Sequence, residues 1–155
     1  MNLKKYFTAR MVTVDIKSSS KADILKELLE LMRSAGAIAS EDLDEANSAI
    51  LKRESKMSTG MQDGIAIPHA RTAVVKDLVA VMGIKREGAD FDSLDGKPSN
   101  IFIMALSPEN HPVPHVQFLA EVSQRLHDAE LRGRLLESKS PQELLDTFFE
   151  FKKRW

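Results

Sequence analysis

Residues 64–71 read GIAIPHAR, and this stretch determines how the rest of the chain is interpreted. The short apolar run at 65–67 predicts a buried strand. We expect the strand to stop at Pro68, which has no amide hydrogen to continue a ladder. His69 then stands at a strand end, where a rigid scaffold holds a side chain that still faces a pocket. Imidazole is neutral and nucleophilic near pH 7, although a turn or surface histidine without a chemical role is the alternative.

Three other segments have strand patterns. Alternation over residues 11–16 predicts a half-buried strand, and residues 78–84 predict another. Residues 101–106 are apolar throughout, which predicts a central strand covered on both faces.

Helical periodicity and capping residues predict five helices. The first follows the serines at 18–20 and ends near Gly36, and the second runs from Ser40 to residues 54–56. The third opens at Pro114, the fourth covers residues 129–136, and the fifth starts at the capping box of residues 140–143.

The resulting order is one strand, two helices, three strands and three helices. One mixed β-sheet flanked by helices satisfies this order most simply. We therefore predict an α/β fold, with residues 1–155 forming a single domain.

Composition excludes several classes of protein. The 155 residues are 43% hydrophobic, carry a net charge of −1 and include no cysteine. A basic footprint for nucleic acid is missing, because the cluster at 152–154 is interpreted as a solvated helix terminus. The sequence has no run of 18 apolar residues and no signal-peptide pattern at its start, so we expect no membrane insertion and a cytoplasmic location.

Three side chains are candidates for one site. His69 follows a strand, His115 falls in the first turn of a helix, and Arg53 lies near the end of the second helix. A neutral imidazole can take up a phosphoryl group, Arg53 offers a planar fork to its oxygens, and Thr59 offers a hydroxyl. Each residue considered alone also has an interpretation without chemistry. Arg53 is then an exposed charge on a helix, Thr59 a turn residue, and His115 a residue that only begins a helix.

Metal and nucleotide chemistry fit the sequence poorly. His69, His111 and His115 match no standard zinc spacing, and His111 and His127 receive no role. The phosphate-binding patterns GxxxxGK[ST] and GxGxxG are absent. We therefore expect no metal and no cofactor.

Taken together, Arg53-Glu54, Ser58-Thr59-Gly60 and the GIAIPHAR stretch resemble the signature of enzyme IIA domains of the fructose/mannitol type. These domains belong to the phosphoenolpyruvate-dependent sugar phosphotransferase system, and the group includes nitrogen-regulatory enzyme IIA proteins. The resemblance extends through residues 88–96 and through the stretch HVQFLA at 115–120, covering residues 4–151.

The resemblance implies a mixed α/β sheet and a phosphohistidine carrier. His69 is then the phosphorylated residue, which accepts phosphate from a phospho-HPr-like donor; either imidazole nitrogen can carry the phosphoryl group. His115 matches the second active-site histidine, Arg53 the active-site arginine, and Thr59 a position near the phosphate.

Two partner classes remain open for the onward step. In one, a stand-alone regulatory protein of the nitrogen type binds target proteins according to its phosphorylation state. In the other, a sugar-transport component passes phosphate to a separate IIB domain. No IIB or IIC segment is attached to this sequence, which favours the regulator. Two prolines at 112 and 114 stiffen the entrance to the expected site. A degenerate domain without phosphotransfer is disfavoured, because His69, His115 and Arg53 are all present.

Overall fold

The computed structural model describes residues 1–152, so residues 153 and 154 of the basic C-terminal cluster lie outside the described part. Two short 3-10 helices, Leu3–Tyr6 and Ala9–Met11, precede the first strand, and a third covers Ser40–Asp42. The strands are β1 (Val12–Thr13), β2 (Ile65–Ala66), β3 (His69–Arg71), β4 (Val79–Ala89) and β5 (Ser99–Ser107). The α-helices are α1 (Lys21–Ser34), α2 (Leu43–Lys56), α3 (Pro112–Leu126), α4 (Ala129–Leu136) and α5 (Pro141–Glu150).

The five strands form one sheet in the order β1-β4-β5-β2, with β3 also pairing with β5. The two long strands, β4 and β5, run antiparallel. The three short strands pair with them in parallel, β1 with β4 and both β2 and β3 with β5. The predicted mixed sheet flanked by helices is therefore confirmed.

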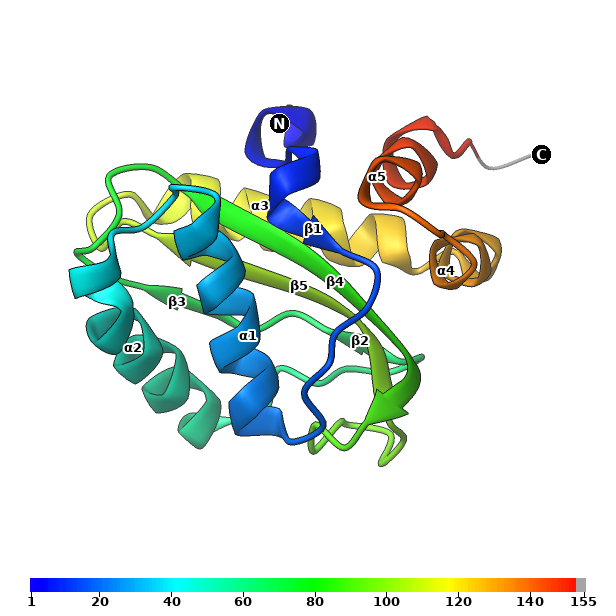
Figure 1. The fold of residues 1–155 in the computed structure, drawn as a ribbon, viewed down its shortest axis with the longest axis horizontal. Helices are drawn as coiled ribbons and strands as arrows, with labels where there is room; N and C mark the ends of the chain where they lie inside the picture. Colours follow the sequence, from blue (N-terminus) through cyan, green and yellow to red (C-terminus); the bar gives the residue numbers. More distant parts are fainter. Residues whose placement is uncertain (153–155) are drawn as a thin grey trace.

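Helices cover both faces of the sheet. Figure 1 shows α1 and α2 on one side and α3, α4 and α5 on the other. The alternation of side chains along β5 supplies both cores. Ile101, Ile103 and Ala105 pack into the cluster that holds Phe118 of α3, whereas Phe102, Met104 and Leu106 pack into the cluster that holds Leu28 of α1. The prediction of a central strand buried on both faces is confirmed.

Side-chain caps explain where two helices begin. The Ser20 hydroxyl accepts a hydrogen bond from the Asp23 amide at the start of α1, and the Ser140 hydroxyl accepts one from the Glu143 amide at the start of α5. These bonds satisfy amides that have no partner within the first turn. The Glu143 carboxylate accepts from the amide of Lys139 and not of Ser140, so the capping box is displaced by one residue.

Two predicted boundaries near the candidate site are wrong. His69 does not lie after a strand, as predicted, but is the first residue of β3. The Pro68 carbonyl accepts a hydrogen bond from the Ala105 amide, so pairing with β5 resumes directly after the proline. The third helix begins at Pro112 and not at Pro114. Proline is compatible with any position of a first turn, where the amides need no intrahelical acceptor.

Other differences concern strand length. β1 contains only Val12 and Thr13 of the predicted strand, because Met11 belongs to the preceding 3-10 helix and residues 14–16 leave the regular strand pattern. β4 continues to Ala89, five residues past the predicted end, with an irregular register between Ile84 and Ala89. Lys85 interrupts the apolar pattern there, yet its ammonium group is buried and bonds to the Ile16 carbonyl and to Glu87. Within residues 1–152, none of the helices is both long and apolar enough to cross a bilayer.

Candidate active site

Three elements contribute to one open depression between α2 and α3. It has a volume of about 1000 Å³, and its lining includes Arg53 from α2, His69 and Arg71 from β3, and His115 from α3. The structure therefore brings together the three principal residues singled out in the sequence. The lining cations Lys52, Arg53, Lys56 and Arg71 outnumber the anions Glu45 and Glu109. An excess of positive charge in a depression favours an anionic ligand.

The register of β3 fixes the direction of His69. His69 pairs with Ala105 and Arg71 pairs with Ser107 of β5, while Ala70 packs into the core on the α1 side. Ala105 belongs to the opposite core, so His69 and Arg71 share the face that α3 covers.

A backbone carbonyl fixes the tautomer of His69. The Nδ1 atom lies 2.8 Å from the carbonyl oxygen of Ile67. Because a carbonyl can only accept, Nδ1 carries the proton and Nε2 carries the free lone pair. The hydrogen bond thus indicates which nitrogen of the neutral ring is free, a choice that the sequence leaves open.

The surroundings of His69 keep its ring neutral. Burial lowers the pKa of His69, and the hydrogen bond to Ile67 opposes this effect in part. The nearby Arg53 cation lowers the pKa further, whereas the Glu54 carboxylate raises it. The net direction is downward, so the lone pair of Nε2 is available at neutral pH.

His115 lies beside His69 and is even less accessible. The two rings have centroids 5.3 Å apart, and only 8% of His115 is exposed. Its Nδ1 atom forms a hydrogen bond with the hydroxyl of Ser107, at the end of β5. Burial lowers the pKa of His115 to about 4, together with the neighbouring His69 ring, which would repel a second protonated imidazole, and the charges of Arg71 and Arg53. This ring is therefore neutral near pH 7 as well.

Arg53 presents part of its guanidinium group to the depression. Its Nη1 atom donates to the Met57 carbonyl at 2.7 Å, which fixes the side chain against the end of α2. A guanidinium has five N–H donors, so others remain for a ligand. A planar fork of this kind matches the oxygens of a phosphoryl group.

Thr59 takes a different position from the one expected. It is buried and is not part of the lining, and its hydroxyl donates to the Glu54 carboxylate. The Thr59 amide donates to the same carboxylate at 3.2 Å, and the Lys21 ammonium lies 2.9 Å from it. This geometry gives Thr59 no direct contact with the depression. Thr59 holds Glu54, the neighbour of Arg53, in place.

Sequence reasoning missed three residues of this region. Arg71 is part of the GIAIPHAR stretch without a role of its own in the sequence pattern, although it lines the depression. Ser107 ends an apolar strand, and Glu54 follows the candidate arginine. Ser107 and Glu54 are polar residues at buried positions, and this polarity is the sequence signal that could have pointed to them. Within residues 1–152, no three His, Cys, Asp or Glu side chains converge as a metal site requires.

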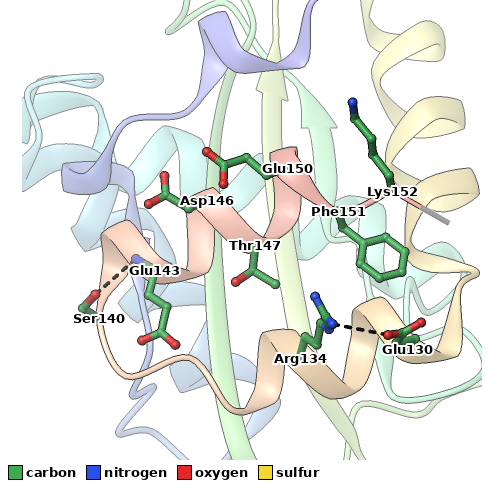
Figure 2. A pocket seen from close by; sticks show the side chains of 9 residues that line it. All are labelled: Glu130, Arg134, Ser140, Glu143, Asp146, Thr147, Glu150, Phe151 and Lys152. Carbon is green, nitrogen blue, oxygen red and sulfur yellow. Dashed lines mark hydrogen bonds and ion pairs between the residues drawn. The ribbon is translucent and has the colours of Figure 1, made fainter. Parts of the chain in front are cut away.

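A second hollow lies between α4 and α5, with a volume of about 740 Å³. Figure 2 shows its charged lining, in which Arg134 pairs with Glu130 at 3.4 Å and Ser140 caps the helix through Glu143. Both members of the ion pair are more than half exposed. Its lining includes no histidine, serine–histidine pair or buried acid. The depression that holds His69, His115 and Arg53 is therefore the candidate site.

Comparison with known proteins finds relatives along nearly the whole chain. The model of the family "Phosphoenolpyruvate-dependent sugar phosphotransferase system, EIIA 2" matches residues 5–150. A fructose-specific EIIA component from Haloferax volcanii is 34% identical over 140 residues, covering 90% of this chain and 90% of that protein. A fructose-specific EIIABC component from Bacillus subtilis is also 34% identical, over 146 residues, and this chain spans 23% of its length.

A solved structure of a nitrogen-regulatory protein has a similar fold. The crystal structure of the nitrogen regulatory protein IIA-Ntr from Neisseria meningitidis superimposes with a TM-score of 0.85 and 26% identity, covering 96% of this chain and 99% of that one. The match of the family model to nearly the whole chain and the solved fold give the same result: the chain belongs to the EIIA 2 family of the phosphoenolpyruvate-dependent sugar phosphotransferase system.

Proposed function

We propose that this protein is a phosphohistidine carrier that accepts a phosphoryl group on Nε2 of His69 from a phosphorylated HPr-like protein. The observation that carries the proposal is the hydrogen bond from Nδ1 of His69 to the Ile67 carbonyl, which leaves Nε2 unprotonated beside an arginine and a second histidine. Membership of the family supports the same role.

The transfer requires only nitrogen nucleophiles. The lone pair of His69 Nε2 attacks the phosphorus of the donor phosphohistidine, a new P–N bond forms, and the bond to the donor nitrogen breaks. The donor ring keeps that electron pair and takes up a proton. Catalysis of such a step consists mainly of positioning and of stabilising the charge on the three equatorial oxygens. The depression supplies Arg53, Arg71 and His115 for this purpose.

His115 and Arg53 have distinct tasks in the proposal. Arg53 contributes a permanent charge and a fork of donors to the phosphoryl oxygens. His115 is neutral, so it donates a hydrogen bond without adding a full charge that would hold the phosphoryl group too tightly. We keep Thr59 as an indirect contributor that fixes Glu54 behind Arg53.

The onward step has two candidates. The likeness to a nitrogen-regulatory protein supports a regulator whose binding to a target depends on phosphate at His69, since a phosphoryl group adds about 1.5 to 2 negative charges. The higher identity to a fructose-specific EIIA component supports a transport component that passes phosphate to a separate IIB domain. Either role belongs to the cytoplasm, where the donor would meet the chain through a transient interface.

Mass spectrometry tests the carrier proposal. The purified chain is incubated with phosphoenolpyruvate, enzyme I and HPr, and its intact mass is recorded before and after acid treatment. We expect a gain of one acid-labile phosphate. His115→Ala should still accept phosphate but transfer it onward more slowly. No gain with a donor system that is verified on a second EIIA protein would contradict the proposal.

Two further measurements separate the onward candidates. Transfer of labelled phosphate from the chain to a purified fructose-type IIB domain would support the transport role. Binding of a target that is retained by the unphosphorylated chain and released after phosphorylation would support the regulatory role.

A further inference from the structure

A buried serine faces the second histidine of the site. Ser107 is the last residue of β5 and is fully buried, and its hydroxyl forms a hydrogen bond with Nδ1 of His115. Its backbone carbonyl is already used, because it accepts from the Thr72 amide at 2.9 Å. Among the described residues, the Ser107 hydroxyl has no hydrogen-bond partner other than His115.

The direction of this hydrogen bond follows from the requirement that a buried hydroxyl proton find an acceptor. If Nδ1 of His115 donated to Ser107, the hydroxyl proton would be left buried without an acceptor, which is costly. If the hydroxyl donates to Nδ1, its proton is satisfied, and unused oxygen lone pairs cost less. The second arrangement places the proton of the neutral His115 ring on Nε2.

The two neighbouring histidines are then set in opposite tautomers by opposite partners. A backbone carbonyl accepts from Nδ1 of His69 and leaves Nε2 as a nucleophile. A serine hydroxyl donates to Nδ1 of His115 and leaves Nε2–H as a donor. One ring is prepared to bond to phosphorus and the other to hydrogen-bond to a phosphoryl oxygen. The low pKa of His115, about 4, ensures that this neutral form is present at pH 7.

We infer that Ser107 is a positioning residue that fixes the Nε2–H tautomer and the orientation of His115 for phosphoryl transfer. The consequence for transfer rests on the proposed carrier function, whereas the tautomer does not. Ser107 does not itself line the depression, so its action passes through the imidazole.

The tautomer is measured by ¹⁵N NMR of the chain labelled at its four histidines, with His115 assigned from the spectrum of His115→Gln. We expect wild-type His115 to be protonated on Nε2, with Nδ1 shifted by its hydrogen bond. Ser107→Ala should remove that shift, and Ser107→Thr, which keeps the hydroxyl, should restore it. Protonation of Nδ1 in the wild type, or an unchanged Nδ1 resonance in Ser107→Ala, would overturn the inference.

A matched control is available on the same strand. Ser99 is also fully buried in β5, but its hydroxyl bonds to that of Ser93. Ser99→Ala removes a buried hydroxyl away from the histidines and should leave the His115 resonances unchanged.

The functional readout is transfer of phosphate from the phosphorylated chain to unphosphorylated HPr. Ser107→Ala should slow this transfer about fivefold to tenfold, the factor expected for losing one neutral hydrogen bond, while His69 still accepts one phosphate. Unchanged transfer would overturn the positioning role. If the wild type accepts no phosphate, the carrier proposal fails, and the NMR result still decides the tautomer.

Discussion

Two hollows of this protein are both lined with charged side chains, yet they differ in what lies beneath the charges. Between α2 and α3, hydrogen bonds with Ile67 and Ser107 hold two neutral histidines, which lie beside Arg53 and Arg71. Between α4 and α5, the charges of Glu130 and Arg134 pair with each other at the surface. Exposed ion pairs of this kind contribute little to stability or binding.

The two hollows both contain many charges, but among the described residues only the first contains groups whose protonation the fold controls. Such groups are a better guide to a functional site than the volume of a cavity or its number of charges. The pKa of His69 and that of His115 are both lowered because the rings are buried among cations. Perturbed histidines that converge in a depression are typical of functional sites.

The largest expected effect comes from removing the nucleophile. His69→Ala should abolish phosphorylation completely, because the depression then contains no unprotonated Nε2 atom positioned by Ile67. Glu143→Gln, in the hollow between α4 and α5, should leave phosphorylation unchanged. Intact mass after incubation with the donor system measures both. Full phosphorylation of His69→Ala would place the acceptor elsewhere and remove the distinction between the hollows.

The next effect concerns pH and stability. The pKa of His115 falls from 6.5 unfolded to about 4 folded. The unfolded chain therefore binds more protons between these values. The stability contributed by the neutral ring is fully present above pH 6.5 and is lost as the pH falls toward 4. The total loss is up to about 3 kcal/mol.

Urea unfolding at pH 7.5 and at pH 5 measures this loss. His115→Gln should lose less stability than the wild type over that interval, because a group that titrates has been removed. His127→Gln, which changes an exposed histidine outside the site, should behave as the wild type. An equal loss in all three proteins would mean that burial of His115 does not control its protonation.

An intermediate effect is expected for Arg53. Arg53→Met keeps much of the side-chain length but removes the donors, and the rate of phosphorylation should fall about 10- to 100-fold, as for loss of a hydrogen bond to a charged group. Arg134→Met is the matched change in the other hollow and should not alter the rate. Rapid-quench measurement of phosphate on the chain compares them. Equal rates for the two variants would contradict a role for Arg53.

The smallest effect lies in the hollow of Figure 2. Ser140→Ala removes the hydroxyl that caps α5 and should lower the free energy of unfolding by about 1 kcal/mol. The rate of phosphorylation should stay as in the wild type. Urea unfolding together with the phosphorylation assay separates the two properties. A loss of activity without loss of stability would give this hollow a functional role.

Local rules predicted the helices well, because caps such as Ser20 and Ser140 act within one turn of sequence. They predicted β3 poorly, since each of its residues pairs with a residue of β5 that lies 36 positions further along the chain. The start of α3 was also missed, because His111 at its N-cap forms no side-chain hydrogen bond and Pro112 and Pro114 are both compatible with a first turn.

The sequence predicted three residues of the candidate site but not their protonation. The places of His69, His115 and Arg53 at a strand end, a helix start and a helix end pointed to one site, and the structure brings all three to one depression. The tautomer of His115 depends on Ser107, which only the fold brings to that ring. The tautomer of His69 depends on the Ile67 carbonyl, two residues earlier, whose direction the sequence pattern does not give. The sequence also did not predict the position of Thr59, because the turn that follows α2 brings its hydroxyl to Glu54.

The most direct test of phosphorylation on Nε2 of His69 is to locate the phosphorus atom in the phosphorylated protein. Phosphorylated chain labelled with ¹⁵N-histidine is examined by NMR for coupling between phosphorus and a ring nitrogen. We expect coupling to Nε2 of His69, with Nδ1 of the same ring still protonated and bonded to the Ile67 carbonyl. Coupling to Nδ1 of His69, or to any other histidine, would contradict the proposed carrier chemistry.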